Sequence, residues 1–141
     1  MELIKLINGS PVPYTEAAFR ADNKHTVYGP VVSSRHLNAQ DVYRVRKLPE
    51  PTPELGQKAK LDAAPTQSDN GEWTLGWTLV PLSEAEARTL RDKLLVNSDW
   101  TQVADAPVDT TAWATYRQAL RDIPAQSGFP DNITWPQEPT T

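Results

Sequence analysis

Thirteen prolines divide this chain of 141 residues into short pieces. Proline fixes φ and has no backbone N–H, so it interrupts both helices and central strands. We therefore expect short elements joined by extended connections. The alternation of proline with polar residues over residues 49–53 predicts a polyproline II segment. A stiff surface loop is favoured there over a peptide-binding motif.

The N-terminal third predicts two strands and one short helix. Residues 3–7 and 42–48 are rich in residues that pack well on a sheet, and Asn8-Gly9-Ser10-Pro11 ends the first run. Thr15 is a good N-cap for a helix over residues 16–21, with Phe19 as its anchor. Mixed signals between His25 and Gln40 predict a loop.

The clearest β pattern lies in the middle of the chain. Residues 58–63 alternate apolar with charged side chains, and residues 73–79 alternate large with small ones. The intervening Asp69-Asn70-Gly71 favours a hairpin turn, so the two runs are predicted to pair antiparallel. The apolar face of the second run is assigned to the core rather than to an exposed binding ledge; it consists of Trp73, Leu75, Trp77 and Leu79.

Beyond Pro81 the pattern changes to that of a helical hairpin. Ser83 and Glu86 form a capping box for a helix reaching about Val96. Its predicted apolar face is Ala87, Leu90, Leu94 and Leu95. Asp109 or Thr110 caps a second helix that runs to about Ile123. The predicted stripe of that helix is Trp113, Tyr116, Leu120 and Ile123, with Arg117 and Arg121 on another face and Trp100 packed between the two helices.

These patterns together predict an α+β protein. A small antiparallel β-rich part (residues 1–81) precedes a helical hairpin (82–124), and an extended tail rich in Pro and Trp (125–141) follows. This tail contains Phe129-Pro130 and Trp135-Pro136, and is too interrupted by proline to fold alone.

The composition excludes several classes of function. Fourteen Lys and Arg stand against 18 Asp and Glu, a formal net charge of −4, and the bases are scattered, so nucleic acid is not an expected partner. The chain has no cysteine and only two histidines, His25 and His36, without ligand spacing. We expect no metal, no cofactor, no catalytic residue and no membrane segment. The chain is expected to be soluble, in a reducing cytoplasm, and to work by binding.

The C-terminal third resembles the phage tail fibre assembly proteins, often called tail assembly chaperones. The order of the motifs carries the resemblance rather than any single one. They are Leu94-Leu95, Ser98-Asp99-Trp100-Thr101-Gln102, Asp105-Ala106-Pro107-Val108-Asp109, Trp113, Tyr116-Arg117-Gln118-Ala119-Leu120-Arg121-Asp122-Ile123-Pro124, Gly128-Phe129-Pro130 and Trp135-Pro136.

The resemblance implies a small protein, without a catalytic residue, that helps a trimeric tail fibre fold or mature at its receptor-binding end. It implies a place in the host cytoplasm during assembly, and three copies per fibre would follow from the symmetry. The alternative is a permanent structural component of the fibre tip or tail complex in the virion. Phe129, Trp135 and Trp100 are the partner-binding candidates, and the opposing interpretation, a tail folded back over the hairpin, stays open.

Overall fold

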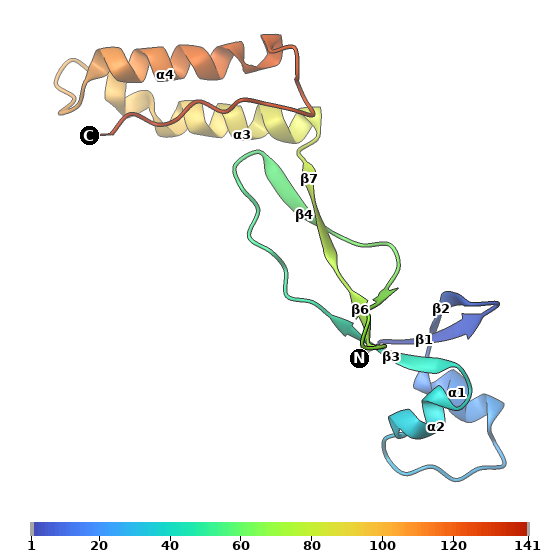
Figure 1. The fold of residues 1–141 in the computed structure, drawn as a ribbon. Helices are drawn as coiled ribbons and strands as arrows, with labels where there is room; N and C mark the ends of the chain where they lie inside the picture. Colours follow the sequence, from blue (N-terminus) through green and yellow to red (C-terminus); the bar gives the residue numbers. More distant parts are fainter. Residues whose placement is uncertain (1, 141) are drawn as a thin grey trace. The chain divides into compact units, whose positions relative to one another are not determined.

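The computed structural model describes residues 2–140 (Figure 1). These residues form two compact units. The first contains residues 2–51 and 60–78, and the second contains residues 52–59 and 79–140. The protein is α+β, as predicted: the first unit holds a mixed sheet and two short helices, and the second holds two longer helices that contact each other.

The sheet of the first unit has the strand order β2-β1-β3-β6-β5. Its strands are β1 (Glu2–Ile7), β2 (Ser10–Tyr14), β3 (Val42–Lys47), β5 (Thr66–Gln67) and β6 (Trp73–Leu75). The expectation of a purely antiparallel sheet is wrong, because β3 and β6 pair parallel, with Val45 opposite Trp73. A parallel pair needs a long connection, and residues 48–72 supply one.

Strand β2 was not predicted. Asn8 and Gly9 both adopt positive φ, 54° and 77°, and make the tight turn from β1. Pro11 and Pro13 then lie opposite Leu6 and Ile4 of β1. Two prolines argued against a strand, but β2 is the edge strand, where a missing ladder donor is tolerated.

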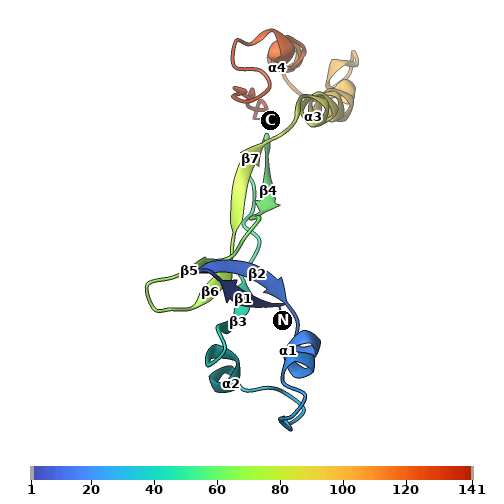
Figure 2. The ribbon, with the colours of Figure 1, turned by 90° about the vertical axis from the view of Figure 1, so that its right-hand side faces the viewer.

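Two helices cover one face of this sheet (Figure 2). Helix α1 (Glu16–Asp22) begins as predicted, with the Thr15 hydroxyl accepting from the Ala18 N–H, and Phe19 is buried. Helix α2 (Ser34–Asn38) shows that the loop predicted over residues 25–40 is wrong in part. It lacks a side-chain cap and is held by tertiary packing, which one short segment does not reveal. The core here is Leu3, Phe19, Val32, Leu37 and Val42.

The second cluster of this unit is Ile4, Val45, Trp73 and Leu75. The predicted apolar face therefore holds for Trp73 and Leu75 but is wrong for Leu79, which is 40% exposed. The run breaks at Gly76, after which β7 (Trp77–Pro81) pairs with β4 (Gln57–Leu61) in a separate two-stranded sheet. The predicted turn at Asn70-Gly71 is present but joins β5 to β6, and Gly71 has φ 84°.

The second unit contains α3 (Glu84–Asn97) and α4 (Thr110–Asp122). The predicted capping box is confirmed: Ser83 Oγ accepts from the Glu86 N–H, and the Glu86 carboxylate accepts from the Ser83 N–H. Short 3-10 turns follow each helix, η1 (Asp99–Gln102) and η2 (Ile123–Ala125). Residues 133–140 contain no helix or strand and run back alongside the helices (Figure 1).

Candidate protein interface

The core of the second unit lies between α3 and α4. Asp109 caps α4, its Oδ1 accepting from the N–H groups of Thr111 and Ala112 at 3.0 Å each. The predicted stripe of α4 is confirmed, since all four of its residues are buried: Trp113, Tyr116, Leu120 and Ile123. Leu94 and Leu95 of α3 pack against this cluster. Leu90 does not belong to it and instead lines a shallow groove with Leu82 and Thr89.

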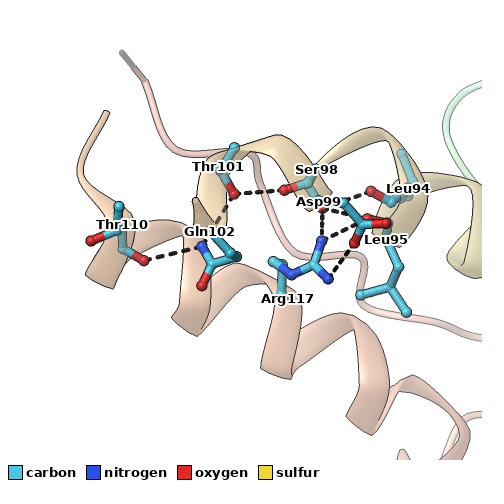
Figure 3. Close-up of polar contacts among 8 residues, drawn as sticks. All are labelled: Leu94, Leu95, Ser98, Asp99, Thr101, Gln102, Thr110 and Arg117. Atoms are coloured by element: carbon cyan, nitrogen blue, oxygen red, sulfur yellow. Dashed lines mark hydrogen bonds and ion pairs between the residues drawn. The ribbon is translucent and has the colours of Figure 1, made fainter. Parts of the chain in front are cut away.

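One arginine joins the end of α3 to α4 (Figure 3). Arg117 Nη1 donates to Leu95 O at 2.6 Å and to Ser98 Oγ at 2.8 Å, and Nη2 donates to Asp99 Oδ1 at 2.6 Å. The Arg117 side chain is only 11% exposed. The sequence placed Arg117 on a face other than the apolar stripe. Nothing in its spacing indicated a role as the link between the helices.

The turn after α3 is fixed by hydroxyl and amide groups. Ser98 Oγ donates to Leu94 O at 2.8 Å, and the buried Thr101 Oγ1 donates to Ser98 O at 2.6 Å. Gln102 Nε2 contacts Thr110 O at 3.3 Å, which ties the turn to the start of α4 (Figure 3). Four residues of the motif at 98–102 therefore make hydrogen bonds that hold the hairpin together.

Trp100 is the exception in this motif. Its side chain was predicted to pack between the helices, and this is wrong: Trp100 is 49% exposed, whereas Thr101 is fully buried. The 3-10 turn directs Thr101 inward and leaves Trp100 outside. One side of the Trp100 indole is supported by Trp113, with ring centroids 6.2 Å apart at 52°. The ring is therefore in contact on one side, and part of it faces solvent.

Two further apolar side chains accompany Trp100. Val96 is 67% exposed and Val103 is 51% exposed. Val96 is in the last turn of α3, four residues before Trp100, and Val103 directly follows the 3-10 turn, three residues after Trp100. We call Val96, Trp100 and Val103 the Trp100 patch. It is the candidate interface of the second unit.

Phe129 and Trp135, the other predicted contact residues, are partly buried and pack against the hairpin core. The Phe129 ring lies 5.2 Å from the guanidinium carbon of Arg88 on α3. Trp135 rests on the backbone of Gly56, which has φ 86°. Gln126 holds the intervening segment through two bonds of 2.9 Å to the backbone of Thr134. These contacts describe how the tail packs, and a role in partner binding remains a prediction.

The ionisable groups of this unit report the same packing. The pKa of Tyr116 is raised, first by burial and then by the charge and hydrogen bond of Glu138, so the end of the tail reaches the α4 stripe. The pKa of Glu86 is lowered to about 2, because Lys58 Nζ at 2.7 Å and the Ser83 side chain and backbone all stabilise the carboxylate. Both shifts are explained by structural contacts.

Within residues 2–140, no three Cys, His, Asp or Glu side chains come together in a group that could hold a metal ion. No helix in that range is long and apolar enough to cross a membrane.

Residues 84–140 match the family model described as phage tail assembly chaperone protein. The match begins with α3 and ends in the tail, so it spans the hairpin, the Trp100 patch, Phe129 and Trp135. No curated protein and no solved structure matches the chain. Residues 84–140 of the chain are thus similar to the phage tail assembly chaperone protein family.

Proposed function

We propose that this protein binds the receptor-binding end of a trimeric tail fibre and helps it to fold or mature. Similarity of residues 84–140 to a tail assembly chaperone family supports binding to phage tail proteins, and such a chaperone family is typically non-enzymatic. The exposed Trp100, in the matched region and supported by Trp113, is the observation that carries the proposal.

The physical need for such a factor follows from the fibre. Before three chains have closed around one another, they expose apolar surface and unpaired strand edges that promote aggregation. A partner with a fixed aromatic side chain covers such a surface at little entropic cost, because the aromatic group is already held in place. Trp100 meets this description better than Phe129 or Trp135, which already pack in the unit.

Co-expression with the neighbouring fibre gene tests the proposal. We expect soluble trimeric fibre in the presence of the chain and aggregated fibre in its absence. Trp100→Ala should reduce the yield of trimer at least tenfold, as expected for a central aromatic contact. Val27→Ala is the matched control, because Val27 is 99% exposed on the first unit. Equal trimer yield with and without the chain would refute the proposal.

A released factor and a retained one need the same surface and differ in dissociation rate. Mass spectrometry of purified virions separates the two. A chaperone that is released leaves no signal, whereas a structural component gives a signal in fixed ratio to the fibre.

A further inference from the structure

The charged residues between Leu94 and Tyr116 are all acidic. From Leu94 to Tyr116 the sequence contains Asp99, Asp105 and Asp109 but no Lys or Arg. Asp99 is paired with Arg117, and Asp109 caps α4. Asp105 is exposed in the loop that follows the patch. The nearest base before the patch is Lys93, one helical turn from Val96.

The two units also differ in net charge. The second unit carries ten Asp and Glu against six Lys and Arg, whereas the first carries eight of each. The whole excess of negative charge therefore lies in the unit that contains the patch. Arg117 adds little positive potential at the surface, because its guanidinium is mostly buried and bound to Asp99.

The charge pattern discriminates between two occupants of the patch. A second copy of this chain would bring Asp105 and its neighbours against the same acidic loop, and like charges across an interface are costly. A partner segment with Lys or Arg beside an apolar side chain gains attraction from the same groups. Such a partner also associates faster, because opposite charges steer the encounter.

We propose that the Trp100 patch binds a basic and apolar segment of the tail fibre protein, in which Lys or Arg flank an apolar side chain that contacts Trp100. This inference rests on the proposed function and adds the chemistry of the partner to it. Trp100 supplies the apolar contact and determines how slowly the complex dissociates. Asp105, together with the negative charge of the loop that contains it, determines how fast the complex forms.

The test measures association and dissociation rates of the full chain with the purified fibre protein at about 50 and about 300 mM salt. The association rate of the wild type should fall severalfold at the higher salt. Asp105→Lys should slow association about tenfold at low salt. Asp69→Lys is the matched control, because it makes the same charge change at an exposed turn of the first unit and should leave the rate unchanged.

The outcomes separate the two proposals. If the wild type binds the fibre but neither salt nor Asp105→Lys changes the association rate, the basic partner segment is refuted and fibre binding stands. If the wild type does not bind the fibre, both proposals fall. Sedimentation of the chain alone adds one further outcome. A dimer that Trp100→Ala converts to monomer would show a second copy on the patch and would also overturn the inference.

Discussion

Arg117 and Asp99 form the link between the two helices of the C-terminal unit. Arg117 Nη2 lies 2.6 Å from Asp99 Oδ1, and Nη1 of the same guanidinium reaches the last turn of α3. Asp99 is largely exposed whereas Arg117 is not. The buried arginine is therefore the member of the pair whose removal takes one donor each from Leu95 O and Ser98 Oγ and empties a buried position.

Replacement of Arg117 by Ala should destabilise the second unit by about 3 kcal/mol, because the buried hydrogen bonds are lost and packing along the stem is removed. Urea unfolding followed by circular dichroism measures the change. Asp99→Asn serves as the control and should cost under about 1 kcal/mol, because the exposed amide oxygen still accepts a hydrogen bond. Equal losses for the two variants would contradict this account.

Trp100 and Trp113, whose rings are in contact, should differ sharply in the stability lost when each is replaced by alanine. Trp113 is 7% exposed, and Trp113→Ala should cost about 3–5 kcal/mol through the cavity it leaves. Trp100→Ala should cost about 1 kcal/mol or less, because half of its surface is already in water. Thermal unfolding of the two variants measures the contrast.

Trp113→Phe refines this test. The buried indole N–H of Trp113 has no hydrogen-bond partner among residues 2–140. Phenylalanine removes that donor along with some volume, so the loss should be clearly smaller than for Trp113→Ala. A loss as large as that of the alanine variant would mean that the N–H is satisfied in solution.

The contact of Trp135 with Gly56 makes a sharper prediction about the tail. Gly56 has φ 86°, and a Cβ there would overlap the Trp135 ring. Gly56→Ala should therefore displace the tail and cost about 2 kcal/mol or more. Gly71→Ala is the matched control: φ is 84°, but the nearest atom to its Cβ would be Gln67 Nε2 at 3.9 Å, so only the backbone strain applies.

A double-mutant cycle isolates the contact itself. In a Trp135→Ala background, Gly56→Ala should cost no more than Gly71→Ala, because the ring that the Cβ overlaps is gone. Chemical denaturation of the four variants gives the coupling free energy between positions 56 and 135. If Gly56→Ala costs the same with and without the Trp135 ring, the tail does not rest on Gly56 in solution.

The sequence predicted the elements with strong local signals. The capping box at Ser83, the Asp109 cap and the α4 stripe are all present, because each depends on residues within one or two turns. What it missed depends on tertiary context. The edge position permits prolines in β2, and packing of Leu37 holds the short α2.

At the candidate site, too, local features were predicted from the sequence and features that depend on tertiary structure were not. The motif at 98–102 is one of several that together carry the resemblance, and, as expected, it forms the turn of a hairpin. Which of its side chains faces outward depends on the 3-10 turn, which exposes Trp100 and buries Thr101. The link from Arg117 to Asp99 spans 18 residues and has no local signature.

Acid should weaken the ion pair between Glu86 of α3 and Lys58 of β4. Its pKa lies at about 2, against 4.5 as the ordinary value, because Lys58 and Ser83 stabilise the carboxylate. A group with a lowered folded pKa binds protons more readily in the unfolded chain. Its stabilising contribution is therefore complete above about pH 4.5 and is lost as the pH falls toward 2. Glu86→Gln should lower the melting temperature at pH 7 and reduce its dependence on pH in that window. If melting temperatures between pH 4.5 and pH 2 fall equally steeply in both proteins, other carboxylates are responsible.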